Sequence, residues 1–580
     1  MQLIFDFVND VGECERVCFT KPHALHVANS IRDVRGVLDA ASEAVAQGFY
    51  TAGFVAYEAG PAFDPAIIAK PDPSFPLAWF AVFERPTAQR PSPSKNYRVG
   101  DWRPEIERGA YDEAVNVIRD QIAKGATYQT NLTMRLRAEF DGDPLAYYET
   151  LRAAHPAPYS AFLDTGRYAI VSLSPELFLR RDRNLLATEP MKGTIARGRW
   201  RAEDDANAAA LRESAKDRAE NVMIVDLMRS DLGRIAVPGS VRTPRLFDVW
   251  PLPTVWQMTS RVECEIDPAT SLTELFDAAF PPGSVTGAPK PMTTGIIDRL
   301  EVSSRRVYCG AIGYASPGAS AVFNVAIRTA IVDKERASVE CGVGGGITWD
   351  SRADDEYREA LAKASFLNRK PPDYRLLETL RLNEDGFFLL DRHLRRIEFS
   401  AGILGFDLAV DALRHSLQNH AMLARDFPRR VRLLVGPNGS VDVESSLLAP
   451  DPAIATVVLA ARPIDVDDPL IFHKTDRRTI YEEHLADAGS VFDVLLWNAK
   501  GQVTEFTRGN FVARLDGHFV TPPLASGLLP GVYREELLSQ GVLAEQEIGI
   551  EQLARCDELW FINSVRKWVR VATGAEASGG

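Results

Sequence analysis

The sequence predicts an α+β protein built from two large units. Its 580 residues correspond to about four compact domains at roughly 150 residues each, which two units of two lobes apiece would fill. Consecutive prolines in the run 369–373 disfavour a continuing helix, so we place the main boundary there, between domains 1–370 and 373–580. Directly after it, two apolar runs flank a turn and lead into a helical pattern, as at the start of an α+β domain.

Apolar spacing on both sides of this boundary predicts the individual elements. Before it, apolar residues between 111 and 122 recur at helical spacing. After it, we expect strands at 376–382 and 387–390 around an Asn-Glu-Asp-Gly turn. Asp391 is a predicted N-cap for the helix that follows, because its side chain can accept from exposed backbone N–H groups. The tail 574–580 is predicted to be disordered.

The bulk composition excludes several classes of function. The chain is 46% hydrophobic and 25% charged, and its net charge of −13 comes without a long Lys/Arg run, which argues against nucleic-acid or anionic-membrane partners. Its six cysteines are too sparse for a disulfide framework and suit a reducing compartment. We find no signal peptide and no apolar run of the ~18–20 residues that span a bilayer. These observations predict a cytoplasmic protein.

Two pairs of acidic residues predict a metal site. Asp217 and Glu220 lie three residues apart in one helical segment, and Glu356 and Glu359 do so in another. Side chains at i and i+3 share a helix face, so each pair can point at one spot. Two facing pairs would give an oxygen-rich site for a hard cation such as Mg²⁺. Acidic pairs on solvated helix faces have the same spacing, so the pattern alone leaves both readings open.

A glycine run and an arginine predict a site for an anionic group. Gly344, Gly345 and Gly346 lack side chains, which lets backbone N–H groups approach an anion closely. Arg328 lies among apolar residues and could form a bidentate pair with a carboxylate, of a ligand or of the protein itself.

In their order and spacing, four segments between residues 100 and 368 resemble the chorismate-utilising family of anthranilate, isochorismate and aminodeoxychorismate synthases. They are 170–198, 216–227, 280–290 and 308–363. The resemblance implies a two-layered β core with flanking helices. It places the metal glutamates at Glu220 and Glu359, with Asp217 and Glu356 in support. It places the contacts to chorismate at Gly193, Thr194, Tyr308, Arg328, Gly344, Gly345, Gly346 and Lys363.

Lys192 indicates which branch of that family the chain resembles. Anthranilate synthases carry alanine at this point of the motif, whereas Pro190-Met-Lys-Gly-Thr194 resembles the aminodeoxychorismate synthase form. The implied mechanism has the Lys192 amine attack C2 of chorismate while Mg²⁺ assists loss of the C4 hydroxyl, and ammonia then enters at C4. Since only a neutral amine is nucleophilic, we expect the site to lower the pKa of Lys192.

Some positions depart from the family pattern. Gln257 stands where the family has a histidine, which puts a general-acid role there in doubt because an amide does not titrate. Ser230 replaces a usual asparagine, and a tryptophan pocket is not recognisable. No cysteine lies in a glutaminase nucleophile turn, so we expect ammonia from a separate glutamine amidotransferase subunit or from free ammonium.

A second lysine predicts a cofactor site beyond the boundary. A lysine that binds pyridoxal phosphate needs a carboxylate facing the pyridine nitrogen and an anion clamp for the phosphate. Lys474, Glu505 and Arg396 can supply these three groups, although each charged residue alone would also suit the surface. Backbone near Val532 and the pair Asn563 and Ser564 would complete the clamp.

Together these residues resemble the fold-type IV pyridoxal-phosphate family over 375–570, with supporting motifs at 377–381, 503–511, 527–531 and 561–564. The resemblance implies two α/β lobes like those of D-amino-acid aminotransferase, and pairing as a homodimer. The family contains branched-chain aminotransferases, D-amino-acid aminotransferases and aminodeoxychorismate lyases. The motifs of this chain do not separate these activities.

The fusion of the two halves favours one reading. A domain that makes aminodeoxychorismate, joined to a fold-type IV domain, predicts a synthase plus a lyase that together yield 4-aminobenzoate, with Lys474 moving protons while pyruvate leaves. One alternative is an anthranilate-type synthase fused to an aminotransferase, against which Lys192 argues. Another is an inactive regulatory or scaffold protein, against which the intact glutamates and both lysines argue.

Overall fold

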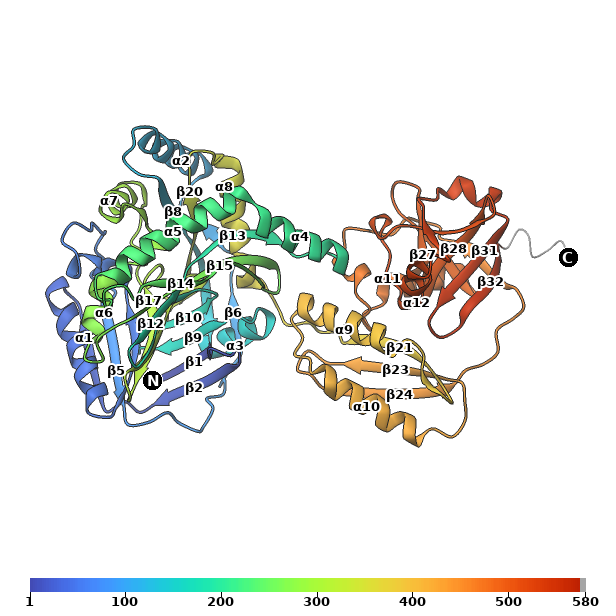
Figure 1. Cartoon of the computed structure of the whole chain (residues 1–580), viewed down its shortest axis with the longest axis horizontal. Coiled ribbons are helices and arrows are strands. Elements are labelled where there is room, and N and C mark those ends of the chain that lie inside the picture. Colours follow the sequence, from blue (N-terminus) through green and yellow to red (C-terminus); the bar gives the residue numbers. More distant parts are fainter. Residues whose placement is uncertain (574–580) are drawn as a thin grey trace. The chain divides into compact units, whose positions relative to one another are not determined.

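The computed structural model describes residues 1–573, which form two compact units (Figure 1). The first unit comprises Met1–Ala196 and Ala208–Pro371, and the second comprises Arg197–Asn207 and the chain from Pro372 onward. The tail predicted to be disordered lies outside the described residues. Each unit has hydrophobic cores of its own, so each is described by itself.

The first unit is built on two antiparallel sheets of ten strands each. In one sheet the order is β16-β8-β20-β19-β10-β9-β1-β2, with β6 and β7 paired to β8. Its strands are β1 (Gln2–Val8), β2 (Cys14–Thr20), β6 (Tyr97–Val99), β7 (Arg103–Pro104), β8 (Gln129–Gly142), β9 (Tyr159–Asp164), β10 (Tyr168–Ser174), β16 (Gly287–Ala288), β19 (Thr329–Asp333) and β20 (Ser338–Ile347).

In the other sheet the order is β13-β15-β12-β11-β18-β17-β4-β5-β3, with β14 paired to β15. Its strands are β3 (Ala24–Ala28), β4 (Tyr50–Val55), β5 (Ala78–Phe83), β11 (Leu177–Asp182), β12 (Leu185–Glu189), β13 (Met191–Ala196), β14 (Arg242–Pro251), β15 (Val255–Glu265), β17 (Ala311–Ser316) and β18 (Ser320–Val325).

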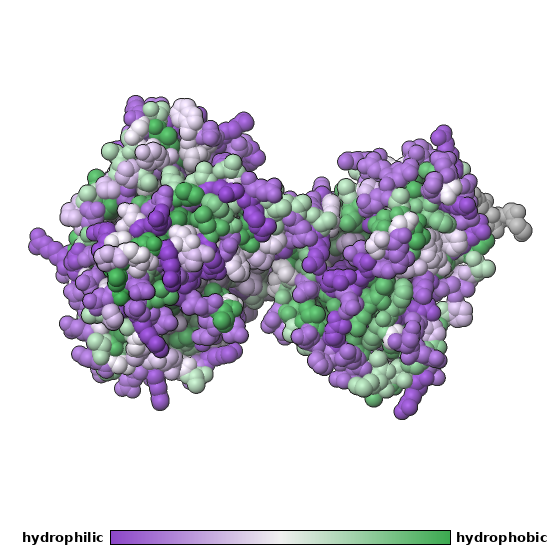
Figure 2. Space-filling model, in the orientation of Figure 1, coloured by the Kyte–Doolittle hydropathy of each residue, from purple (hydrophilic) through white to green (hydrophobic). Residues whose placement is uncertain are grey.

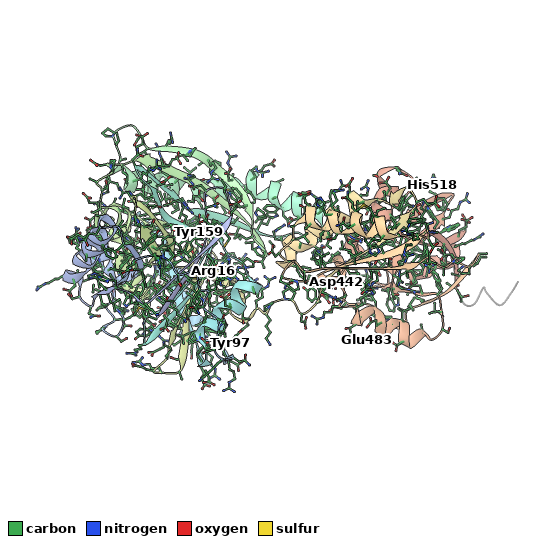
Figure 3. The ribbon with its side chains drawn as sticks, turned by 90° about the horizontal axis from the view of Figure 1, so that it is seen from below. Arg16, Tyr97, Tyr159, Asp442, Glu483 and His518 are labelled. Atoms are coloured by element: carbon green, nitrogen blue, oxygen red, sulfur yellow. The ribbon has the colours of Figure 1, made fainter. Side chains whose placement is uncertain are left out.

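An aromatic core joins the facing sides of the two sheets. It contains Phe5 and Phe19 from the first sheet and Phe54 and Phe83 from the second, each at most 1% exposed. Alternate residues of these strands point inward, as the period of two in a pleated strand requires. Arg16, which Figure 3 labels, lies on β2 at the edge of the first sheet. It pairs with Asp6 at 2.7 Å and with Glu149 at 2.8 Å.

Helices cover the outer faces of both sheets, which gives four layers. Helices α1 (Ile31–Ala46), α5 (Ala215–Gly233) and α6 (Leu272–Ala279) share a core with the second sheet. Helices α2 (Arg108–Ala123), α3 (Pro144–Ala154), α7 (Lys290–Leu300) and α8 (Ala353–Lys363) share one with the first. Helix α4 (Arg201–Glu213) follows β13. The prediction of a two-layered β core with flanking helices is thereby confirmed.

The second unit has two lobes, and the smaller is an antiparallel sheet packed against two helices. The sheet has the order β22-β21-β23-β24. Its elements are β21 (Leu376–Asn383), β22 (Gly386–Phe387), α9 (Leu390–Leu404), α10 (Val410–Leu423), β23 (Arg429–Val435) and β24 (Val441–Leu447). The Asp391 cap is wrong: the N-cap is Leu389, two residues earlier and in a left-handed conformation (φ 56°), so the helix begins at Leu390, and Asp391 pairs with Arg414 at 2.7 Å.

The larger lobe is an eight-stranded mixed sheet of order β27-β26-β25-β32-β31-β28-β29-β30. Since β27 also pairs with β28, part of the sheet closes on itself. Its elements are β25 (Ala455–Leu459), α11 (Thr479–Ala488), β26 (Asp493–Trp497), β27 (Val503–Phe506), β28 (Gly509–Leu515), β29 (His518–Thr521), α12 (Val532–Ser539), β30 (Ala544–Glu545), β31 (Glu558–Asn563) and β32 (Lys567–Thr573).

The visible surface of both units is largely hydrophilic, with hydrophobic residues in scattered groups (Figure 2). Among the described residues, no helix combines the length and the apolar character needed to cross a bilayer.

Candidate active sites

Lys192 lies at an irregularity of β13. The pairing of β13 with β15 shifts register between Met191 and Thr194, and Gly193 between them has φ +91°. That conformation favours glycine. A side chain at Gly193 would also begin 2.9 Å from Cβ of Asp217 on α5, so the absent side chain lets the strand approach the helix. The irregularity thus brings Lys192 and the acidic face of α5 together.

The glycine run of β20 lies beside Lys192. A Cβ atom added to Gly346 would be 3.1 Å from Nζ of Lys192. A Cβ atom added to Gly345 would be 3.4 Å from both Oε2 of Glu356 and Nζ of Lys363. Lys363 also donates to the carbonyl of Gly344 at 3.0 Å. Lys192, Glu356 and Lys363 therefore meet along the three consecutive glycines of one strand.

The surroundings of Lys192 favour its neutral form. Burial lowers its pKa, while the negative charges of Glu220, Glu176 and Glu359 oppose that shift and the positive charge of Lys363 adds to it. An amine with a lowered pKa is more often unprotonated and therefore more nucleophilic near neutral pH. This is the electrostatic environment that a nucleophilic lysine requires.

The four acids predicted to bind metal lie around this lysine but are partly engaged with other groups. Burial raises the pKa of Glu220 and of Glu356, whose Oε1 accepts from Ser351 at 2.6 Å. Burial alone would raise the pKa of Glu359, yet Lys363, 2.8 Å away, lowers it. Ser214 is the N-cap of α5: its Oγ accepts from the backbone N–H of Asp217 at 3.2 Å and donates to the Asp217 carboxylate. Within residues 1–573, no three acidic, histidine or cysteine side chains gather as a metal site, so the magnesium site stays a prediction.

Two side chains to which the sequence analysis gave no role also lie in this region. Glu176 is 4% exposed, and burial raises its pKa to about 7. Hydrogen bonds from Ser284 and from the backbone of Met191, together with the positive charge of Lys192, limit this rise. Gln129 is 1% exposed, and its Nε2 would lie 1.9 Å from a Cβ atom added to Gly346. Its Oε1 has no hydrogen-bond partner in the part of the chain that the structure describes. Glu176 belongs to segment 170–198, but only the fold shows its proximity to Lys192.

Gln257, which replaces a family histidine, supports the strand that carries Lys192. Its Nε2 donates to the carbonyl of Gly193 at 2.8 Å, and its Oε1 accepts from Oγ1 of Thr194 at 3.0 Å. The amide therefore satisfies polar groups at the irregular point of β13, where the regular ladder is interrupted. A positioning role accounts for these contacts without a titratable group.

The other two residues matched to chorismate contacts have different neighbours. Tyr308 is buried, and its ring lies against Gly342, where an added Cβ would come within 2.2 Å of Cδ1. Arg328 Nη1 lies 2.8 Å from Nε2 of His155. No acidic residue pairs with Arg328 in the described chain. Its charge is therefore available to an anionic ligand.

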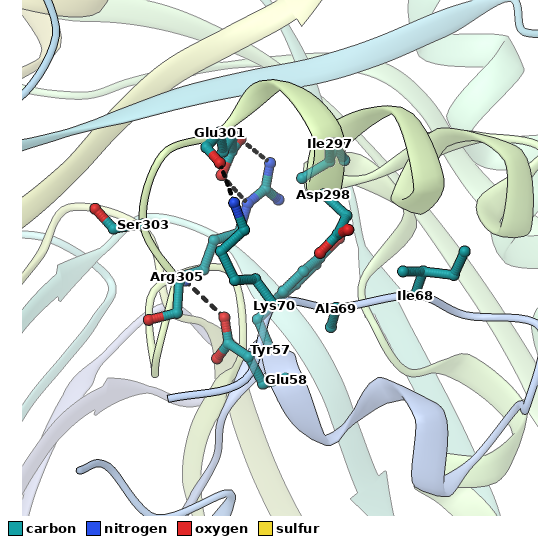
Figure 4. A pocket seen from close by; sticks show the side chains of 11 residues that line it. Tyr57, Glu58, Ile68, Ala69, Lys70, Ile297, Asp298, Glu301, Ser303 and Arg305 are labelled. Atoms are coloured by element: carbon teal, nitrogen blue, oxygen red, sulfur yellow. Dashed lines mark hydrogen bonds and ion pairs between the residues drawn. The ribbon is translucent and has the colours of Figure 1, made fainter. Parts of the chain in front are cut away.

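A separate buried network holds β8, the strand that pairs with the glycine run. Glu301 accepts from Arg305 at 2.5 Å and lies 3.2 Å from Arg135. It also accepts from the backbone and hydroxyl of Thr133. Figure 4 shows Glu301 and Arg305 of this network together with Glu58, around a cavity of about 10 Å³, room for about one water molecule. None of the residues predicted for catalysis or binding lines the cavity, and we assign it a structural role.

In the second unit, Lys474 is fixed to the small lobe through its backbone. Its carbonyl accepts from the N–H of Leu377 at 2.9 Å, and Thr475 forms a bridge with Leu376 of β21. Burial lowers the pKa of the Lys474 amine to about 7, assisted by the positive charges of Arg478 and Arg396. The amine is thus poised to exchange protons near neutral pH.

Glu505 faces the same site from β27. It is 3% exposed, and burial raises its pKa to about 8. The hydroxyl of Tyr481 donates to its Oε1 at 3.0 Å, and Nδ2 of Asn510 lies 3.4 Å from its Oε2. Tyr481 was not predicted from the sequence: it lies on α11, seven residues after Lys474, and belongs to no motif.

The predicted phosphate clamp is only partly assembled by these contacts. Arg396 makes a bidentate pair with Glu378 at 2.8 and 2.6 Å and donates to the carbonyl of Pro530 at 3.1 Å. It therefore lies beside the N-terminus of α12, where Val532 is the first residue. Asn563 instead accepts from two backbone N–H groups in its own turn, and Oγ of Ser564 lies 3.4 Å from the carbonyl of Thr379. The side-chain oxygen of Asn563 is thus occupied by that turn, and its Nδ2 donates to the carbonyl of Arg508 at 3.1 Å.

Comparison with known proteins matches each unit to a family. The family described as chorismate binding enzyme matches residues 12–369, and the family described as Amino-transferase class IV matches residues 375–573. Aminodeoxychorismate synthase component 1 of Escherichia coli (strain K12) is 40% identical over 279 residues, covering 48% of this chain and 61% of that protein. Aminodeoxychorismate synthase of Streptomyces griseus is 44% identical over 274 residues, 47% of this chain and 37% of that protein. The chain therefore spans less than two thirds of these relatives.

A solved structure agrees with the first assignment. Anthranilate synthase component I from Streptococcus pneumoniae TIGR4 aligns with a TM-score of 0.52 at 26% identity, covering 63% of this chain and 90% of that one. The first family match alone covers more than half of the sequence. The chain belongs to the chorismate binding enzymes, and its C-terminal part carries a class IV aminotransferase domain.

Proposed function

We propose that the chain makes 4-aminobenzoate from chorismate in two steps, one in each unit. The observation that carries the first step is the partly buried Lys192, whose lowered pKa and place beside Gly346 suit a nucleophile facing a bound anion. The names of the relatives support the same step, since the Escherichia coli and Streptomyces proteins are aminodeoxychorismate synthases. The class IV domain supports the second step.

In the first step, the Lys192 amine attacks C2 of chorismate, the ring double bonds shift, and the C4 hydroxyl leaves as water. Ammonia then attacks C4, and the bond between C2 and Lys192 breaks to return the free amine. The product is 4-amino-4-deoxychorismate, and the sum is chorismate plus ammonia giving product plus water. Arg328 and the backbone of Gly344 to Gly346 hold the substrate carboxylates, and Lys363 adds positive charge beside them.

Glu176 is the group best suited to supply the proton for the departing hydroxyl. Its pKa of about 7 leaves it protonated in much of the population at neutral pH, unlike an exposed glutamate. It lies near enough to Lys192 for the two charges to affect each other's pKa. It can recover a proton from the Lys192 ammonium that forms during attack, which closes the proton balance without solvent.

Mg²⁺ and an ammonia source complete the proposal for this unit. The acidic donors Glu220 and Glu359, with Asp217 and Glu356 near them, fit a hard divalent cation by chemistry and would hold it next to the substrate. The ion would supply positive charge for a substrate carboxylate. We propose that a separate glutamine amidotransferase supplies ammonia, in line with the "component 1" in the relative's name.

In the second unit, the residues present fit pyridoxal phosphate. Lys474 offers an amine with a pKa of about 7, Glu505 a carboxyl group for the pyridine nitrogen, and Arg396 with the start of α12 a place for the phosphate. When bound, the cofactor withdraws electron density from the carbon that carries the substrate amine. Tyr481 holds Glu505 in place through its hydroxyl.

The lyase step then needs one base and one acid, and Lys474 can act as both. Its amine removes the proton from C4 of the substrate ring, and the bond between C3 and the enolpyruvyl oxygen breaks. Enolpyruvate leaves and becomes pyruvate by taking up a proton on its methylene carbon. The ring becomes aromatic, which drives the elimination.

The deciding experiment incubates the purified chain with chorismate, MgCl₂, ammonium and pyridoxal phosphate and separates the products by chromatography. We expect 4-aminobenzoate and pyruvate in equal amounts. The variant Lys474→Ala should accumulate 4-amino-4-deoxychorismate, whereas Lys192→Met should make neither product yet still convert added 4-amino-4-deoxychorismate. Formation of 2-aminobenzoate would instead identify an anthranilate-type synthase, and the absence of any aromatic amine would reject the proposal.

A further inference from the structure

A histidine contacts the arginine that we assign to the substrate carboxylate. His155 is the C-cap of α3, and its backbone N–H donates to the carbonyl of Leu151 at 2.8 Å. Its side chain is buried, at 4% exposure, and its Nε2 lies 2.8 Å from Nη1 of Arg328. The residues are 173 positions apart in sequence, so the fold alone creates the contact.

The direction of this hydrogen bond fixes the form of the histidine. A guanidinium has only donors, so Nε2 must be the nitrogen without a proton, and the ring must be neutral with its proton on Nδ1. Burial, together with the charges of Arg328 and Arg369, lowers the pKa of His155 to about 3. The ring therefore stays neutral throughout the physiological range.

The His155 side chain carries an unsatisfied polar atom. Nδ1 of His155 is buried and has no hydrogen-bond partner within residues 1–573. A buried N–H without a partner destabilises a fold. An apolar residue of similar size would avoid that penalty, so stability alone does not explain a histidine at this place.

Arg328 occupies a point where the chain passes between sheets. Strand β18 of one sheet ends at Val325, and β19 of the other begins at Thr329. Arg328, directly before β19, has φ +48°, a left-handed conformation that is unusual for a side chain of this size. Among residues 1–573 its guanidinium has no acidic partner, and burial lowers its pKa to about 10. Within the same residues, the only side chain hydrogen-bonded to it is the neutral ring of His155.

We propose that His155 is a positioning residue for substrate binding: it orients the Arg328 guanidinium with a neutral acceptor and so leaves its positive charge for a carboxylate of the substrate. A carboxylate at position 155 would orient the guanidinium equally well but would neutralise it. A neutral acceptor orients without neutralising. The inference rests on the proposed function, because it takes Arg328 as a substrate contact.

Four variants test the inference through the equilibrium dissociation constant for chorismate, measured by calorimetry with Mg²⁺ and without ammonium. His155→Phe keeps the ring volume and removes the acceptor, and we expect binding to weaken about tenfold. His155→Gln restores a neutral acceptor and should recover most of the affinity. His155→Glu places an anion on the guanidinium and should weaken binding more than His155→Phe. His23→Phe, at an exposed histidine, is the control and should bind like the parent protein.

A merely structural role is separated by a double-mutant cycle. In an Arg328→Met background, His155→Phe should change affinity by less than about twofold, since the group it orients is gone. The inference is overturned if His155→Phe binds chorismate normally, if His155→Glu binds better than His155→Phe, or if the loss persists in the Arg328→Met background. A parent protein that binds chorismate but makes no 4-amino-4-deoxychorismate would refute the proposed function while leaving this test intact.

Discussion

The contact between Gly346 and the Lys192 amine makes Gly346→Ala an incisive test of the first site. The new Cβ would lie 1.9 Å from Nε2 of Gln129 and 3.1 Å from Nζ of Lys192. Gly346 does not have a left-handed backbone conformation, so its backbone dihedral angles also suit alanine. The effect of the substitution therefore comes from the steric clash of the new methyl group. An ordinary contact of about 3.4 Å requires the Gln129 amide to retreat by roughly 1.5 Å.

Gln129 has little space for such a movement because it is 1% exposed. We expect a loss of about 1–3 kcal/mol in the free energy of unfolding, the usual range for overpacking a buried site. Displacement of the Lys192 amine by a few tenths of an ångström should lower kcat for chorismate amination by about 10–100-fold, since attack depends steeply on geometry.

The assay combines urea unfolding with initial rates of 4-amino-4-deoxychorismate formation in saturating ammonium. Gly345→Ala is the stability comparison, because its nearest atoms would be at 3.4 Å and its unfolding free energy should change by less than about 0.5 kcal/mol. Gly36→Ala, on the exposed face of α1 with open space around it, should leave kcat unchanged. The reasoning is refuted if Gly346→Ala retains full stability and full kcat.

Three further predictions concern single side chains. Gln257→Leu removes the hydrogen bonds to Gly193 and Thr194, so we expect kcat for amination to fall about tenfold while KM for chorismate changes little. Equal effects on kcat and KM in steady-state assays would contradict a positioning role. With free ammonia held constant, the parent rate should fall as pH rises through about 7, where Glu176 loses its proton, and Glu176→Gln should abolish this fall in the pH profile. The pKa of Glu505 in the folded protein is about 8, above its ordinary value, so Glu505 destabilises the cofactor-free fold increasingly as pH rises from about 4.5 to 8. Glu505→Gln should therefore raise the free energy of unfolding more at pH 8 than at pH 5. Chemical denaturation at these two pH values checks the sign.

The fold class followed from sequence because its signals are local. Proline and glycine breaks and apolar periodicity predicted α+β units, and family motifs predicted the two-layered core that the structure confirms. The prediction of an Asp391 cap was wrong because the backbone is left-handed at Leu389 and the helix starts directly after it. The Asp391 carboxylate instead forms an ion pair with Arg414 of α10. A tertiary ion pair of that kind leaves no local mark in the sequence.

The sites were predictable only where a residue lies inside a motif. Lys192 and the glycines of β20 lie inside such motifs, and the fold places them together. Glu176 and His155 become relevant through contacts with residues far away in sequence, Glu176 by burial next to Lys192 and His155 by its bond to Arg328. Their residue types are common in loops and at helix ends, so one sequence cannot distinguish them from bystanders.

The two lysines reach a lowered pKa in opposite electrostatic surroundings. Burial lowers the pKa of both, but the largest charge effect on Lys192 comes from Glu220 and raises its pKa, whereas that on Lys474 comes from Arg478 and lowers it. Removing the charge with the largest effect should therefore shift the pKa values of the two lysines in opposite directions. We expect Glu220→Gln to lower the pKa of Lys192 further and Arg478→Met to raise that of Lys474 above about 7.

Cyanate reacts only with neutral amines, so the pH dependence of carbamylation, followed by peptide mass spectrometry on cofactor-free protein, reports each pKa separately. Each variant serves as the control for the other, because Glu220→Gln should leave the midpoint of Lys474 unchanged and Arg478→Met that of Lys192. Midpoints that do not move in either variant would mean that burial alone sets both values. Midpoints that move in the same direction would mean that the substitutions change solvent access rather than charge, and the electrostatic account of both nucleophiles would be wrong.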